Sequence, residues 1–204
     1  MNIPKRLVAV AALAGVAAFP TAAVADPGDS SDVDVIVDIT PIKVPGVLAL
    51  TVAGSAVALR ENDSTPTVRQ FTGTLPTVTV TDTRTADEIP AGSSWAVLGS
   101  SSDFTGTGLA PITADHLGWK PRLVDPGDSA GQVSEGEEVV TSLDQPTQPG
   151  NNVGLTDQEL LVSTYDSASV TGGAYSVNAD LFLRTPADVQ AGSYQAKLTL
   201  SLFE

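Results

Sequence analysis

Acid–base chemistry near neutral pH would have to start from His116, the single histidine of the chain, which lies next to Asp115. A hydrolase triad needs such a base held between an acid and a nucleophile. However, the one G-x-S-x-G match, Gly127 to Gly131, lies in an expected loop and not in a strand-to-helix elbow. Paired carboxylates carry no signal in a chain with 24 Asp and Glu residues. The sequence therefore favours a non-enzymatic protein without a cofactor. A secreted hydrolase acting on carbohydrate is the least favoured alternative.

Three aspartates close to the N-terminal region, Asp26, Asp29 and Asp32, offer the oxygen ligands that calcium prefers. Their spacing does not match an EF-hand loop, and the following Asp34 and Asp38 fit the outward face of a strand. The chain has no cysteine and one histidine, which excludes Cys-ligated zinc and multi-histidine sites. We therefore predict no metal site and retain the three aspartates only as weak calcium candidates.

The two tryptophans, Trp95 and Trp119, are the residues best suited to stack on a sugar ring. Trp95 alternates with Val97 in the expected strand 94–98, and a tryptophan at such a position normally packs in a core. Trp119 precedes Lys120 and Pro121 in an expected loop. Of the two, Trp119 is therefore the better candidate for an exposed binding aromatic.

The elements that must position these residues are short strands separated by turns. Residues 77–81 are an example of such a strand. Threonines alternate with valines there, which gives the strand one polar and one apolar face. Loops are expected over 99–115 and 125–154, and a turn over 185–192. This organisation predicts an all-β fold, an immunoglobulin-like or Greek-key β-sandwich with long loops. The expected strands are 33–40, 47–52 and 56–59 (a hairpin around 53–55), 77–81, 94–98, 160–162, 176–183 and 193–202.

The first 25 residues have the three parts of a secretory signal peptide. Lys5 and Arg6 precede the apolar run 7–19, and Ala23-Val24-Ala25 forms an A-x-A cleavage site. The run is shorter than the roughly 20 residues that a membrane-spanning helix needs, so we expect no membrane span after cleavage. The expected organisation is a signal-peptide helix over 1–25, an N-terminal extension with a first strand over 26–45, and a sandwich domain over 46–204.

The net charge of the chain limits the classes of molecule that it can bind. Ten Lys and Arg residues stand against 24 Asp and Glu residues, which gives a formal net charge of −14. Such a surface repels a phosphate backbone, so nucleic acid is excluded as a partner, and anionic lipid is disfavoured for the same reason. No wall-sorting signal follows Leu198, so covalent attachment to a cell wall is not expected.

Seven segments match one known family in its order: 77–84, Trp95-Ala96-Val97, Ser102-Asp103-Phe104-Thr105, 117–121, Ala179-Asp180-Leu181, Pro186-Ala187 and 192–202. This ordered set resembles the WxL-domain family of Gram-positive surface proteins in its actinobacterial form. The chain departs from the family pattern at Val97, where the family has leucine, and at Leu200, which replaces the second tryptophan. Both changes are apolar and suit a packing role.

The resemblance implies an exported protein that associates non-covalently with the cell wall, through peptidoglycan or another wall polymer, and that acts beside other surface proteins. An alternative comes from the alternating segment 32–40, which suits strand addition in a pilin-like or fibre-forming subunit. The resemblance assigns wall binding to the motif residues Trp95, Val97, Asp103, Phe104, Trp119, Leu200 and Leu202.

Overall fold

A computed structural model describes residues 34–127 and 131–204 of the chain. The chain divides into one unit over Met1–Ile42 and a second, compact unit over Lys43–Glu204. The expected signal peptide and the calcium candidates Asp26, Asp29 and Asp32 lie outside the described residues. Within the described part, no helix is long and apolar enough to cross a membrane.

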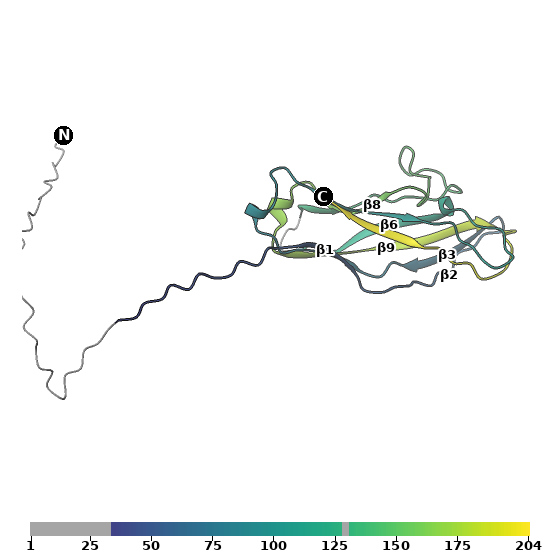
Figure 1. Ribbon diagram of the computed structural model, residues 1–204. Coiled ribbons are helices and arrows are strands. Elements are labelled where there is room, and N and C mark those ends of the chain that lie inside the picture. Colours follow the sequence, from purple (N-terminus) through teal and green to yellow (C-terminus); the bar gives the residue numbers. More distant parts are fainter. Residues whose placement is uncertain (1–33, 128–130) are drawn as a thin grey trace, which may run out of the picture. The chain divides into compact units, whose positions relative to one another are not determined.

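The compact unit is all-β, because its strands form two antiparallel sheets and its described helices are only short 3-10 turns. One sheet has the order β1-β4-β9-β3-β2, with β6 also paired to β9, and the other has the order β10-β5-β8-β7 (Figure 1). The predicted β-sandwich class is confirmed. The strands of the first sheet are β1 (Leu48–Val52), β2 (Arg60–Glu61), β3 (Val68–Thr74), β4 (Val78–Asp82), β6 (Leu117–Asp125) and β9 (Gly173–Pro186).

The second sheet supplies the other wall of the core. Its strands are β5 (Trp95–Ser101), β7 (Val133–Glu135), β8 (Glu159–Thr164) and β10 (Leu198–Phe203). Three 3-10 turns, η1 (Ala86–Glu88), η2 (Ala114–His116) and η3 (Ser167–Val170), lie in the connections.

The long strand β9 organises the first sheet. It pairs with β4 through residues 173–177 and with β3 through residues 180–186, while β6 pairs with it over 176–183. Alternate side chains of β9 face the core, which explains why the sequence alternates in apolar and polar residues there. The buried members of this row are Tyr175, Val177, Ala179, Leu181, Leu183 and Thr185.

Strand β4 confirms the predicted division of its two faces. Val78 and Val80 are fully buried, whereas Thr79 and Thr81 are half-buried on the other face. The next inward position is Asp82, a carboxylate with no exposed surface. Arg84 satisfies this carboxylate through its Nε at 2.9 Å and its Nη2 at 2.8 Å. A buried charge is therefore paired within two residues of its own strand.

The predicted hairpin around residues 53–55 is wrong. Strand β1 pairs with β4, from Leu48 opposite Asp82 to Val52 opposite Val78, and residues 56–59 form no strand. The pairing with β4 places Leu48 and Leu50 against the core, and a tight turn back onto 56–59 would not do this. Non-local burial therefore outweighs the local turn signal.

The strand predicted over 33–40 does not form in this chain. Residues 34–40 carry no regular secondary structure and are exposed, and Val35 has 90% of its surface accessible. The alternation is real, but within the described part of this molecule the segment has no sheet partner.

Candidate functional site

Trp95 belongs to the core. It lies in β5 with 1% of its surface exposed, and its ring centroid is 5.7 Å from that of Tyr175 in the opposite sheet. Val97, two residues further on, is fully buried on the same face. The prediction that Trp95 packs in the core is confirmed. Neither Trp95 nor Val97 presents a side chain that a wall polymer could contact at the surface.

Trp119 is also fully buried, and the expectation of an exposed aromatic in a loop is wrong. The residue lies inside β6, opposite Leu181 of β9. Its backbone also exchanges two hydrogen bonds with Val139, of 3.0 and 2.9 Å. Pairing on both edges holds Trp119 in extended backbone. Its indole is therefore directed into the core, where Gly99 of β5 leaves room for the ring.

The remaining motif residues are placed as structural elements. Leu200 and Leu202 of β10 are half-buried and pack against the core. Phe104 is half-buried and pairs with Ile112. The Asp103 side chain is exposed, but its Oδ1 accepts a hydrogen bond of 3.0 Å from the backbone nitrogen of Ala114. The motif set therefore marks packing and turn positions and does not converge on one surface.

His116 forms a compact cluster with Thr113 and Asp115. Thr113 Oγ1 and Asp115 Oδ1 both lie against the same ring nitrogen, Nδ1, at 3.1 and 3.0 Å, and the Thr113 hydroxyl donates to Asp115. A catalytic triad places the acid and the nucleophile on opposite nitrogens of the imidazole. The cluster lacks this arrangement and instead fastens the turn η2 to the chain around it.

Asp115 is the most perturbed acid of this cluster. Partial burial acts to raise its pKa, but hydrogen bonds from Ser142, Thr113 and His116 outweigh this effect and hold the pKa at about 2. A carboxyl group of this kind stays ionised at neutral pH and is unsuited to donate a proton. Its role is to anchor the loop that contains Ser142, whose backbone nitrogen also bonds to the Asp115 carbonyl at 2.9 Å.

No group of three or more His, Cys, Asp or Glu side chains within the described residues is arranged to hold a metal ion. Asp34 and Asp38 are exposed. The calcium prediction for Asp26, Asp29 and Asp32 concerns residues outside the described part and stays a prediction.

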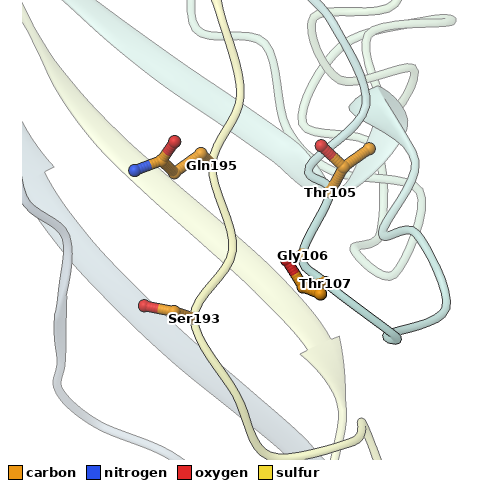
Figure 2. Close-up of a pocket in the computed structure, with 5 residues that line it drawn as sticks. All are labelled: Thr105, Gly106, Thr107, Ser193 and Gln195. Carbon is orange, nitrogen blue, oxygen red and sulfur yellow. The ribbon is translucent and has the colours of Figure 1, made fainter.

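An open hollow of about 500 Å³ is lined by residues of the loop after β5 and of the segment before β10. Figure 2 shows these two segments running side by side, with Ser193 and Gln195 projecting to the same side of their segment. Thr105 and Gln195 hold the two segments together, because each backbone nitrogen donates to the carbonyl of the other residue at 2.9 Å. The lining residues are Thr105, Gly106, Thr107, Ser193 and Gln195.

The chemistry of this hollow is that of neutral hydrogen bonding. Its side chains are hydroxyls and one amide, and none of its five lining residues is ionisable. Such groups donate and accept hydrogen bonds without a charge, which suits the hydroxyl and amide groups of a sugar. Thr105, Ser193 and Gln195 lie in the matching motif segments, but none of them was a predicted binding residue. The pocket was missed because its two halves come from distant segments of the chain.

Comparisons of the chain with protein-family models, with curated proteins and with solved structures found no match. The resemblance to the WxL-domain family therefore stays a prediction that rests on the ordered motifs of the sequence. The geometry adds that the tryptophans of those motifs pack inside the sandwich.

Proposed function

We propose that this protein is an exported, non-enzymatic surface protein that associates non-covalently with a neutral glycan of the Gram-positive cell wall, such as the glycan strand of peptidoglycan. The signal-peptide pattern over 1–25 and the resemblance to the WxL-domain family support export and wall association. The observation that carries the choice of site is the hollow lined by Thr105, Thr107, Ser193 and Gln195 with Gly106, which combines hydroxyl and amide groups.

The choice of a neutral glycan follows from charge. A chain with a net charge of −14 is repelled by phosphate-bearing wall polymers, as it is by nucleic acid. The hollow contributes no positive side chain that would offset this repulsion. The hollow is open, and its volume of about 500 Å³ leaves room for one or two sugar rings at the surface. Binding would rest on hydrogen bonds and would be weak for each site.

The hollow is held in shape by the fold around it. Thr105 and Gln195 are joined through their backbones, so their side chains are free to bind a ligand. Ser102 Oγ also accepts a hydrogen bond of 2.9 Å from the backbone nitrogen of Lys197, next to the pocket. A site on segments that are fixed in this way loses little entropy when a ligand binds.

Co-sedimentation with purified cell walls tests this proposal. Residues 26–204 should pellet with the walls and stay in solution without them. The variant Thr107→Ala/Gln195→Ala removes two polar side chains of the hollow, and it should lower the apparent affinity about tenfold, as the loss of one or two hydrogen bonds predicts.

A matched control is Ser134→Ala/Gln158→Ala, which removes a hydroxyl and an amide from exposed positions outside the hollow. This variant should bind walls as well as the parent chain. If the parent chain remains entirely in the supernatant, wall association is wrong. If all three proteins bind equally, the protein binds walls but the hollow is not the site.

A further inference from the structure

The segment 34–40 carries apolar side chains that nothing covers within the described part of the chain. Val35, Val37 and Ile39 share one face of an extended backbone, and they are 90%, 74% and 85% exposed. Soluble monomers rarely leave such a continuous apolar row in water. Asp34 and Asp38 lie on the other face with Ile36 and Thr40. This alternation is typical of a strand that has one buried face and one face that is more exposed to solvent.

The length of this row is limited on its C-terminal side. Pro41 has no backbone N–H and interrupts a ladder of hydrogen bonds. A strand built from this segment therefore ends at Thr40, and its described part covers seven residues, 34–40. The strand it would join needs a free edge of similar length.

Strand β10 has such an edge. It pairs with β5 on one side, and on the other side it has no strand partner in the described part. The backbone nitrogen of Ser102 donates to the carbonyl of Lys197 at 2.9 Å. In an antiparallel ladder alternate residues make these bonds, so Thr199, Ser201 and Phe203 bond to β5. The free N–H and C=O groups of the outer edge therefore belong to Leu198, Leu200 and Leu202.

The side chains of the same three leucines favour an added strand. Leu198, Leu200 and Leu202 are half-buried and pack against the core from the rim of the sheet. An added strand with Val35, Val37 and Ile39 on that face would extend the core past them. Lys197, just before β10, is exposed and forms no ion pair with the described residues, so it can face an aspartate of the incoming segment.

The other described edges fit less well. Strands β2 and β7 have two and three residues. The edge of β6 away from β9 is bridged to Val139, and β6 contains Pro121. Strand β1 offers five residues and is the closest competitor, but it is shorter than β10 and ends in exposed residues. The six residues of β10 match the seven of the segment best.

We propose that residues 34–40 of one molecule add as a strand to the outer edge of β10 in a second copy of this chain. Main-chain hydrogen bonds to Leu198, Leu200 and Leu202 hold the strand, and its apolar row covers their half-exposed side chains. Donor and acceptor are different surfaces, so each copy can give its segment and receive another. Contacts of this heterologous kind build rings or open fibres.

The test measures self-association and hydrogen exchange of residues 26–204 in the absence of cell walls. Sedimentation velocity should show a series of species that grows with protein concentration. Because the copies are strongly acidic, added salt should strengthen the association by screening their repulsion. Hydrogen exchange read by NMR should show the amides of Leu198, Leu200 and Leu202 becoming protected as the oligomers form. The amides of Thr199 and Ser201 should be protected at every concentration.

Two matched variants distinguish the contributions of the two faces of the segment to self-association. Val37→Ser/Ile39→Ser removes apolar side chains from the face that meets the core, and it should abolish both the oligomers and the new protection. Ile36→Ser/Thr40→Ser changes two residues of the other face and should leave both in place. All four positions are exposed in the single chain, so neither variant should change the free energy of unfolding of the monomer.

Four outcomes would overturn the proposal. One is a chain that stays monomeric with open amides at the β10 edge. Another is protection that does not depend on concentration, which means that the edge is covered within one molecule. A third is protection at Leu48, Leu50 and Val52, which places the strand on β1. The last is association that survives Val37→Ser/Ile39→Ser.

Discussion

Gly99 of β5 lies directly beneath the indole of Trp119 in β6. A Cβ atom added at Gly99 would lie 2.6 Å from Cη2 of Trp119 and 3.0 Å from Cδ2 of Leu200. The two strands belong to different sheets, so this contact sets how closely the sheets approach at that point. The indole of Trp119 is accommodated because the residue opposite has no side chain.

Gly99→Ala should therefore destabilise the protein. The added methyl group enters a packed region whose neighbours are a buried ring and a leucine at the rim, and overpacking of this kind costs about 1–3 kcal/mol. Chemical denaturation followed by tryptophan fluorescence measures the change. The variant Gly99→Ala/Trp119→Phe is the control, because phenylalanine lacks the ring atoms that would clash. In a double-mutant cycle Gly99→Ala should cost less in this background, and equal costs in both backgrounds would contradict the contact.

The tryptophans should matter for stability and not for wall binding. Trp95→Ala removes a fully packed side chain and should cost about 3–5 kcal/mol. Trp95→Phe keeps an aromatic ring against Tyr175 and should retain a folded domain. Neither indole nitrogen has a hydrogen-bond partner in the described part, so phenylalanine removes none. Folded Trp95→Phe protein should bind purified walls as the parent does. A large loss of binding would show that Trp95 contributes to wall binding.

Arg84 joins the two sheets at one end of the sandwich. It holds the buried Asp82 and also makes hydrogen bonds of 2.6 and 2.8 Å to Glu204, just after β10. Hydrogen bonds with Asp82, and then with Glu204, raise the pKa of Arg84, so it stays charged. Arg84→Gln should cost about 3–5 kcal/mol, because it leaves a buried carboxylate unpaired. Glu204→Gln should cost less than about 1 kcal/mol, because Glu204 is partly exposed. Equal effects in denaturation experiments would contradict this ranking.

Stability should fall in acid. The pKa of Asp115 is lowered from 3.8 to about 2 in the folded protein, so its contribution is present above the unfolded value and is lost as the pH falls through the folded one. The pKa of Glu88 is also lowered, by hydrogen bonds from the backbones of Thr85 and Gly46. The free energy of unfolding, measured by denaturant titration, should decrease between about pH 5 and about pH 2.

Asp115→Asn provides the control for this pH dependence. The amide cannot ionise, so the variant should be less stable at neutral pH and should lose less stability on acidification than the parent. Asp38→Asn changes an exposed aspartate and should leave the profile as it is. A parent chain whose stability stays constant down to about pH 2 would show that Asp115 does not contribute in this way.

Alternation along the chain predicted several of the strands, although the strand expected over 193–202 begins only at Leu198 and the one expected over 33–40 does not form in the described residues. Strands β4, β5, β9 and β10 follow the period-two pattern of their side chains, and the burial of Trp95 follows from its alternation with Val97. The all-β class follows from the same pattern. This works because the two faces of a strand are a property of neighbouring residues and need no knowledge of the partner strand.

Only the tertiary structure decided where the strands pair and what they bury. Trp119 looks like a loop residue beside Lys120 and Pro121, and it becomes a core residue because β9 and Val139 hold its backbone on both edges. The hollow at Thr105 and Gln195 is likewise built from two distant segments. The alternating segment 34–40 has the pattern of a strand but no partner in its own described chain. A local pattern specifies a strand's faces, while its partner is selected by the apolar surface that pairing removes from water.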